Sequence, residues 1–214
     1  MPPLSGTVCI VDDDPAVLRA LTRLIGTTGL RVKAYDTAAT FLEGRLPNGP
    51  NCLLLDLRMP GLGGLDVQRE LAARGLRLPV IFLTGHGDVP SSVEAMKAGA
   101  LDFLTKPVPG AELLEAVRSA IEKDKNRLKG ERGLEAIRRR VATLSPREHE
   151  VFRWVIAGRL NKQTAAEMGI SEKTVKFHRA MVMQKMKAGS VAELTLLADR
   201  AGIAPMRKPL PAAD

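Results

Sequence analysis

The sequence predicts an α/β fold, a doubly wound parallel sheet of five strands, followed by an all-α domain with a helix-turn-helix. Three observations lead to this prediction. Short, β-rich apolar runs alternate with helical stripes through the first 121 residues. Acidic residues and a lysine stand where several of those runs stop. From residue 143 onward the pattern changes to four helices separated by glycines and capping residues.

In the first half we expect strands at residues 7–11, 31–35, 52–55, 80–84 and 101–104. We expect helices at residues 15–28, 37–43, 65–73, 90–97 and 110–121. The run at 52–55 is apolar throughout, as expected for a strand with both faces covered. Strands that alternate with helices predict a doubly wound parallel sheet, whose ligands bind at the carboxyl ends of the strands.

Charge is divided unevenly along the 214 residues. Residues 1–121 contain 12 Lys+Arg and 13 Asp+Glu, whereas residues 122–214 contain 20 and 11. A near-neutral half followed by a basic half suggests two functions, the second with nucleic acid. No apolar run is long enough to span a membrane, and MPPLSGTV lacks the features of a secretion signal. Cys9 and Cys52 lie in apolar runs, so we expect a cytoplasmic protein with either two buried thiols or a redox pair.

Acidic residues and a lysine collect at the predicted ligand-binding edge. Asp12 and Asp13 follow the first apolar run, Asp56 follows the third, and Lys106 follows the fifth. Converging carboxylates repel unless a cation intervenes, and Mg²⁺ prefers oxygen ligands of this kind. Lys106 would then meet an anion held by the metal. This pattern predicts a phosphoryl-accepting aspartate, whereas Asp14, before a proline, is predicted to cap a helix.

The segments VDDDP, LDLRMPG and LTGHGDVPSSVEAMKAGALDFLTKP resemble the receiver domain of two-component response regulators. They are most similar to the FixJ branch of the FixJ/NarL/LuxR type, and the resemblance covers essentially the whole first half. It implies that Asp56 accepts a phosphoryl group from a sensor histidine kinase. It also implies that Asp12, Asp13, Asp56 and the backbone carbonyl of Arg58 hold Mg²⁺.

The same resemblance assigns roles around the phosphoryl group. It implies that Thr84 donates its hydroxyl to one phosphoryl oxygen and that Lys106 pairs with another. Phe103 matches the aromatic switch that rotates when Thr84 moves, and the bond between Lys106 and Pro107 resembles the family's cis peptide. His86 is either a metal ligand or a loop histidine that tunes the site.

Residues 122–142 are predicted to form a charged, helical linker between a receiver domain at 1–121 and a helix-turn-helix domain at 143–204. Gly130 and Gly133 interrupt the run of charged residues. An apolar stripe either dimerises as a coiled coil or packs on the following domain; it consists of Leu134, Ile137, Val141 and Leu144. Three basic residues either contact DNA phosphates or are solvated; they are Arg138, Arg139 and Arg140. Residues 205–214 are predicted to be a disordered tail.

The second half contains capping and turn residues at the positions expected for a helix-turn-helix. Ser145 and Glu148 form a capping box, and Asn161 is expected to cap the helix at 162–168. Gly169 suits the turn, and the basic helix at 172–187 fits a major groove.

Residues 144–194, LSPREHEVFRWVIAGRLNKQTAAEMGISEKTVKFHRAMVMQKMKAGSVAEL, resemble the LuxR/NarL-type DNA-binding domain. The resemblance implies base contacts by Lys176, Phe177 and Ala180, and phosphate contacts by Lys173, Thr174, His178 and Arg179. Phe177 either touches a thymine methyl or is partly core. The hydroxyl of Thr164 either finds a partner or faces water. In the last helix, four apolar residues form a dimer seam or pack inward: Val191, Leu194, Leu197 and Ala198.

The sequence therefore predicts a response regulator and transcription factor, not an enzyme. Phosphorylation is expected to favour a homodimer through the region 90–104, which binds promoter DNA, with RNA polymerase as a further candidate partner. One alternative is a DNA-binding regulator that needs no phosphate. The other is an aspartate-nucleophile phosphatase, which normally has a second acid two residues after the nucleophile, where this chain has Arg58.

Overall fold

The structure is a computed structural model that describes residues 5–85 and 89–206. The chain divides into two compact units, Met1–Lys129 and Gly130–Asp214. Within the described residues, no helix combines the length and the apolar character that a membrane crossing requires.

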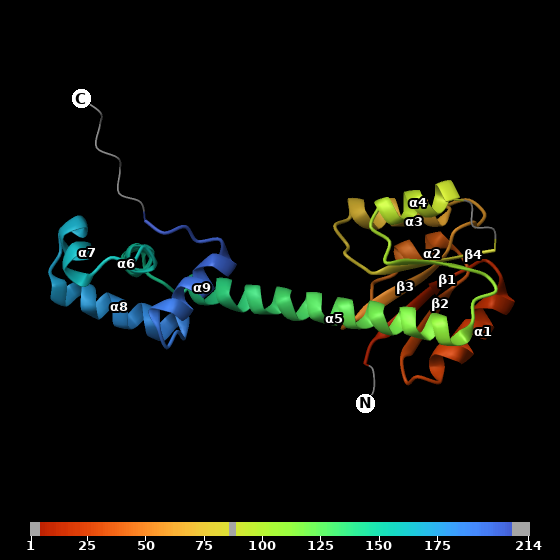
Figure 1. The fold of residues 1–214 in the computed structure, drawn as a ribbon, viewed down its shortest axis with the longest axis horizontal. Coiled ribbons are helices and arrows are strands. Elements are labelled where there is room, and N and C mark those ends of the chain that lie inside the picture. Colours follow the sequence, from red (N-terminus) through yellow and green to blue (C-terminus); the bar gives the residue numbers. More distant parts are fainter. Residues whose placement is uncertain (1–4, 86–88, 207–214) are drawn as a thin grey trace, which may run out of the picture. The chain divides into compact units, whose positions relative to one another are not determined.

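The first unit is built on a parallel sheet with the strand order β2-β1-β3-β4-β5. The strands are β1 (Thr7–Val11), β2 (Arg31–Tyr35), β3 (Asn51–Asp56), β4 (Val80–Thr84) and β5 (Asp102–Thr105). The helices are α1 (Pro15–Gly26), α2 (Ala38–Glu43), α3 (Gly64–Ala73), α4 (Val89–Lys97) and α5 (Gly110–Val141). Figure 1 shows α1 and α5 on one face of the sheet and α2, α3 and α4 on the other. The predicted doubly wound fold is confirmed.

Two hydrophobic cores lie on the two faces of this sheet, because successive strand residues point to opposite sides. Val8 and Cys52 pack in the core under α1 and α5, whereas Cys9 packs in the core under α2, α3 and α4. The two cysteines are on neighbouring strands but on opposite faces, since Cys52 pairs in register with Val8. The redox-pair interpretation is therefore wrong. Both thiols are free and buried, and burial raises the pKa of Cys9 to about 11.

Helix α5 is longer than the sequence predicted. It continues without a break through Gly130 and Gly133 to Val141, so the linker is helical, as the sequence predicted. Glycine costs a helix only about 1 kcal/mol per residue, which packing at other positions can outweigh. Asp124 is 1% exposed, and its carboxylate accepts the backbone N–H of Asn51 at the start of β3, at 2.8 Å. This contact ties the start of the charged segment to the sheet, and the division between the two units, after Lys129, falls inside the predicted linker at 122–142.

The second unit is a small helical domain. It contains the end of α5 and the helices α6 (Pro146–Ile156), α7 (Asn161–Met168), α8 (Glu172–Met186) and α9 (Val191–Ala201). Its core joins fully buried residues of α6, α8 and α9, among them Phe152, Val182 and Leu194. Ile137 of α5 is 4% exposed and belongs to this core, and Val141 packs against it. Ile137, Val141 and Leu144 of the linker's apolar stripe thus pack on the core of the helical domain, as one of the two alternatives predicted.

The end of the chain is more closely packed than predicted. Leu194 and Ala198 are 0% and 1% exposed, so the central residues of the possible dimer seam point into the core of their own domain. Met206 packs against the same core, and its N–H donates to the carbonyl of Arg153 at 3.0 Å. The predicted disordered tail is therefore wrong at its first residues, while 207–214 lie outside the described residues.

Candidate functional site

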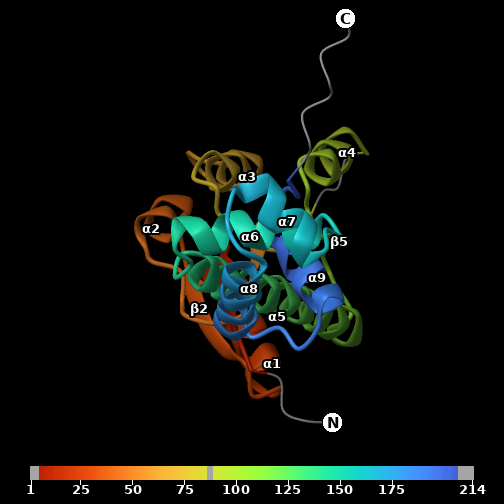
Figure 2. The same ribbon diagram turned by 90° about the vertical axis from the view of Figure 1, so that its left-hand side faces the viewer.

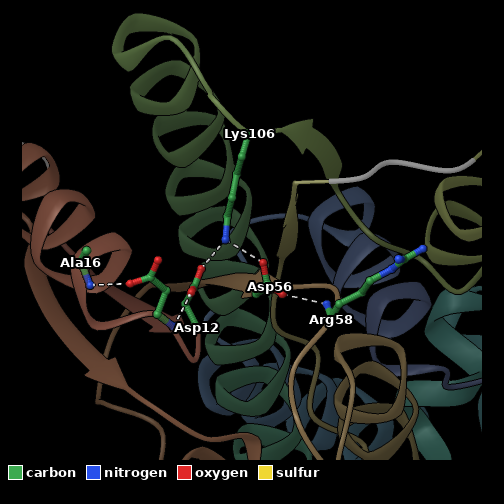
Figure 3. A network of polar contacts seen from close by, with 6 residues as sticks. Asp12, Ala16, Asp56, Arg58 and Lys106 are labelled. Carbon is green, nitrogen blue, oxygen red and sulfur yellow. Dashed lines mark hydrogen bonds and ion pairs between the residues drawn. The ribbon is translucent and has the colours of Figure 1, made fainter.

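Asp12, Asp56 and Lys106 meet at the carboxyl edge of the sheet (Figure 3). Asp12 follows β1, Asp56 ends β3, and Lys106 follows β5. Because β1 and β3 are parallel neighbours, their ends lie side by side at this edge. Lys106 Nζ lies 2.5 Å from Asp12 Oδ2 and 2.6 Å from Asp56 Oδ1. The structure thus brings together three residues that the sequence assigned to one site.

This cluster combines burial with opposing charge. Asp12 is 1% exposed and Asp56 is 7% exposed, whereas the Lys106 side chain is 24% exposed. Burial lowers the pKa of Lys106, but hydrogen bonds to Asp12 and Asp56 raise it more, so its pKa lies above the ordinary value. The ammonium therefore stays charged at neutral pH and offsets part of the repulsion between the two carboxylates.

Backbone N–H groups donate hydrogen bonds to the remaining carboxylate oxygens of the two acids. Asp12 Oδ1 accepts the N–H of Asp14 at 3.0 Å, and Asp56 Oδ2 accepts the N–H of Arg58 at 2.7 Å. All four carboxylate oxygens thus have a hydrogen-bond donor, which fixes the orientation of both acids. Asp14 has the separate role predicted for it, because its side chain accepts the N–H of Ala16 at 2.7 Å and caps α1.

Gly64, the first residue of α3, supports the site and was not found from the sequence. A Cβ added there would lie 2.5 Å from the carbonyl oxygen of Asp56 and 2.8 Å from the ring of Phe82. Its N–H donates to the carbonyl of Leu57 at 3.0 Å, so α3 starts directly against the end of β3. The glycine-rich run MPGLGG, which follows Asp56, was the available signal.

The other predicted residues lie at the same edge without joining the ion pairs. Asp13 is exposed in the loop after β1. Thr84 ends β4, is 2% exposed, and its carbonyl accepts the N–H of Lys106 at 2.7 Å. Phe103 in β5 is half-buried, with its ring centroid 6.3 Å from that of Phe82. The peptide bond after Lys106 is cis, as the resemblance implies.

The acids fit a magnesium ion by their chemistry. Mg²⁺ takes oxygen ligands, keeps several waters, and is usually bound by one or two protein carboxylates together with phosphate oxygens. Asp12 and Asp56 supply two convergent, buried carboxylates, and in this arrangement the ammonium of Lys106 bridges them. Within 5–85 and 89–206, no three or more His, Cys, Asp or Glu side chains lie close enough together to hold a metal ion by themselves. His86 lies outside the described residues.

The second candidate site is the helix-turn-helix formed by α7 and α8. Figures 1 and 2 show these two helices side by side. Gly169 between them has φ 64° and ψ 35°, the left-handed conformation predicted for the turn. Ala165 and Val175 are 8% and 0% exposed and fill the angle between the helices. The predicted Asn161 cap is displaced by one residue, since Leu160 precedes α7 and donates its N–H to Gln163 Oε1 at 3.0 Å.

The structure separates the seven predicted DNA contacts into two groups. Exposed on α8 are Lys173, Lys176, Phe177 and Ala180; partly buried are Thr174, His178 and Arg179. Phe177 is 61% exposed, so it is not a core residue. Thr164 is 1% exposed, and its hydroxyl has no hydrogen-bond partner among the described residues, so it does not face water as one alternative expected.

Several cationic side chains of α8 already have partners. Lys176 pairs with Glu172 at 3.2 Å, and Arg179 Nη1 donates to Asn161 Oδ1 at 3.0 Å. Lys185 Nζ lies 2.6 Å from the buried carboxylate of Glu148 in α6, which makes it a structural residue. Only part of the positive charge counted in the sequence is therefore directed outward from α8.

The sheet, the acidic cluster and the helix-turn-helix together define a response regulator with a DNA-binding output domain. Residues 8–118 match the family "Response regulator receiver domain", and residues 142–198 match "Bacterial regulatory proteins, luxR family". The chain belongs to the response regulators that join a receiver domain to a LuxR-type DNA-binding domain, a class of transcription regulators. Membership implies a kinase as partner and DNA as ligand, and receiver domains typically bind Mg²⁺ at the phosphorylation site.

Relatives of the whole chain support this assignment. Nodulation protein W of Bradyrhizobium diazoefficiens is 46% identical over 92% of this chain and 86% of its own length. The transcriptional regulatory protein FixJ of Azorhizobium caulinodans is 44% identical over 95% of this chain and 96% of its own length. Among solved structures, the response regulator StyR has a TM-score of 0.84 and 40% identity over 91% of this chain and 98% of its own. Full-length FixJ from B. japonicum has a TM-score of 0.57 and 42% identity, over 92% of this chain and 97% of its own.

Proposed function

We propose that Asp56 accepts a phosphoryl group from a sensor histidine kinase and that this modification controls promoter binding by the second unit. The observation that carries the proposal is the bridge from Lys106 to the buried carboxylates of Asp12 and Asp56. A lysine held between two buried acids can exchange one carboxylate oxygen for a phosphoryl oxygen, because both are anionic acceptors.

The transfer is a displacement at phosphorus. A carboxylate oxygen of Asp56 forms a bond to phosphorus while the P–N bond of a phosphohistidine breaks, and the imidazole leaves with the electron pair. Lys106 neutralises part of the charge on the phosphoryl oxygens. Thr84, at the end of the neighbouring strand β4, donates its hydroxyl to one of them.

Mg²⁺ belongs to the proposed site. Asp12, Asp13 and Asp56 would hold it, together with the backbone carbonyl of Arg58. When bound, the ion supplies further neutralisation of phosphoryl charge. The convergence of two buried carboxylates at the edge of the sheet supports this ligand set.

Phosphorylation would then act as a switch. It adds about −1.5 to −2 charges and three strong acceptors, which attract the hydroxyl of Thr84. Phe103 is half-buried on β5, in register with Phe82, two residues before Thr84. It would rotate into the space that Thr84 leaves, which shifts the balance between two existing conformations. We propose that the shifted state dimerises through α4 and β5, where Val93 and Met96 are 44% and 47% exposed.

The second unit would place α8 in the major groove of promoter DNA. Base edges would be contacted by Lys176, Phe177 and Ala180, and phosphates by Lys173, Thr174, His178 and Arg179. A dimer would read two half-sites about one helical turn apart. We propose a cytoplasmic regulator, with RNA polymerase as a further partner.

Phosphoryl transfer is tested with the purified chain, Mg²⁺ and acetyl phosphate, and measured as intact mass. We expect the mass gain of one phosphoryl group in the wild type and none in Asp56→Asn. Asp36→Asn is the matched control, because Asp36 is an exposed aspartate that directly follows β2. If Asp56→Asn gains the same mass as the control, Asp56 is not the acceptor.

DNA binding is tested with the same variants on a duplex selected from a random pool. Phosphorylated wild type should bind more tightly than Asp56→Asn, and the affinity should fall steeply with salt because phosphate contacts release counterions. Equal binding by both proteins would favour the alternative of a regulator that needs no phosphate.

We further propose that the chain is not a phosphatase. Such an enzyme normally has a second acid two residues after the nucleophile, whereas Arg58 stands there and its backbone N–H is bound to Asp56. Asp56-dependent turnover of phosphate esters would contradict this.

A further inference from the structure

A cavity lies at the amino-terminal ends of β4 and β5, at the edge of the sheet opposite to the acidic cluster. Its volume is about 560 Å³, within the range of roughly 300–1,000 Å³ that is usual for small-molecule sites. Its walls come from the end of α3, the loop before β4, the end of α4 and the middle of α5. All of these segments belong to the first unit. We call it the amino-edge cavity.

The inner part of the amino-edge cavity is apolar. Leu71 and Val80 are buried there, and Leu78, Pro79 and Leu101 are partly buried. These side chains come from α3, from β4 and from the segments that lead into β4 and β5. An apolar ligand would lose contact with water on several sides at once, which favours its binding.

Two sets of polar contacts hold the walls in place. Gln68 of α3 is 6% exposed, and its Nε2 donates to the carbonyl of Ala95 in α4 at 3.2 Å. Asp124 of α5 accepts the N–H of Asn51 at one carboxylate oxygen and the guanidinium of Arg127 at the other. The walls are therefore fixed in the manner of a preformed ligand site. Oε1 of Gln68 is buried without a hydrogen-bond partner among the described residues, so the inner wall has a polar group still to be satisfied.

Positive charge is in excess around the amino-edge cavity. Arg77 and Lys123 line it with exposed side chains, and neither has an ion-pair partner within the described part of the chain. Asp124 is the single acid among the described lining residues, and Arg127 pairs with it at 2.7 Å. Two cations thus remain unbalanced beside apolar walls, which favours an anion.

We propose that the amino-edge cavity binds a small organic anion with an apolar body and one carboxylate, sulfonate or phosphate group. The apolar body lies against the leucines of the inner walls, and the anionic group pairs with Arg77 or Lys123. The site lies at the opposite end of the sheet from Asp56, so binding there requires neither phosphorylation nor DNA.

Two fluorescent dyes that differ only in charge test this proposal on the full-length chain. Anilinonaphthalene sulfonate has an apolar body with one sulfonate, and phenylnaphthylamine is the same body without the sulfonate. We expect saturable binding of both dyes to the wild type in a fluorescence titration. Arg77→Gln combined with Lys123→Gln should weaken the sulfonate by about three- to tenfold, the size expected for two exposed ion pairs, and leave the neutral dye unchanged.

The matched control for charge is Lys97→Gln combined with Lys125→Gln. Both lysines are exposed in the first unit and neither lines the amino-edge cavity. This variant loses the same charge, so its affinity for the sulfonate should stay close to that of the wild type.

Two further variants fill the cavity. Ala72→Phe and Ala98→Phe each add a ring at an exposed lining position, from α3 and from the end of α4. Each should remove the saturable binding of both dyes. Ala73→Phe is the control, because Ala73 is also exposed on α3 but does not line this cavity. Thermal unfolding identifies the variants that fold as the wild type does, and either filling variant is sufficient for the test.

The outcomes are distinct. If the wild type shows no saturable binding of the sulfonate, or if the filling variants bind it as well as Ala73→Phe does, the site is overturned. If the filling variants lose both dyes but the Arg77 and Lys123 variant binds the sulfonate like the wild type, the selectivity for anions is overturned. A cavity that receives an apolar side chain of another protein would give this second result.

Discussion

Replacing Lys106 by methionine tests the electrostatic account of the acidic cluster. The substitution keeps an unbranched stem of similar length but leaves the carboxylates of Asp12 and Asp56 buried beside each other without their shared ammonium. Breaking a buried ion pair by removing one partner destabilises a protein by about 3–5 kcal/mol. Since the Lys106 side chain is 24% exposed, we expect a loss at or just below the lower end of this range, about 2–3 kcal/mol.

The assay is unfolding in urea in the absence of Mg²⁺, monitored with two spectroscopic probes. Far-ultraviolet circular dichroism reports both units, whereas the fluorescence of Trp154 reports the second unit, because it is the single tryptophan of the chain. With a slope of about 2 kcal/mol per molar urea, the transition of the first unit should move down by about 1 M. The transition seen by Trp154 should not move.

Mg²⁺ should then restore the stability that the first unit loses when the charge of Lys106 is removed. A ligand at a hundred times its dissociation constant stabilises the folded state by about 2.7 kcal/mol. Without the competing ammonium, Lys106→Met should gain more stability from Mg²⁺ than the wild type does. Lys97→Met, at an exposed position in α4, should change stability little in either condition. If Lys106→Met is as stable as Lys97→Met in the absence of metal, the cluster is not held by this charge balance.

Three further outcomes are expected. Gly64→Ala should destabilise the first unit by about 1–3 kcal/mol and slow phosphorylation, whereas Gly26→Ala, where an added Cβ meets nothing within 4 Å, should be near neutral in urea unfolding. Hydrogen bonding to the Lys185 side chain holds the pKa of Glu148 below its ordinary value of 4.5. The ionised Glu148 carboxylate therefore stabilises the second unit above about pH 4.5, and this stabilisation is lost as the pH falls further. Glu148→Gln should therefore be less stable than the wild type at pH 7, and the difference in Trp154-detected unfolding should shrink with acid. Gly130→Ala and Gly133→Ala should each stabilise α5 by about 1 kcal/mol and slow amide hydrogen exchange in that part of the helix. Unchanged exchange would mean that α5 does not open at these positions.

Much of the first site could be predicted because it depends on local position along the chain. Asp12, Asp56 and Lys106 each stand just at or after the end of a β run, and a parallel sheet brings such ends to one edge whatever the details of packing. The same reasoning did not find Gly64, since its importance comes from a close approach between α3 and the carbonyl of Asp56. That contact joins two elements whose distance the sequence pattern does not specify.

By itself, the sequence determined the order of strands and helices, the acidic edge and the helix-turn-helix, because periodicity, capping residues and charge act over a few neighbouring positions. Only the tertiary structure decided which face each ambiguous residue occupies. Cys9 and Cys52 lie on opposite faces of the sheet. Helix α5 runs through its two glycines because Asp124 and Ile137 anchor it on either side of them. Phe177 is exposed on a helix whose opposite side is buried. Each of these depends on contacts between residues far apart in the chain, and such contacts arise only when the whole domain packs.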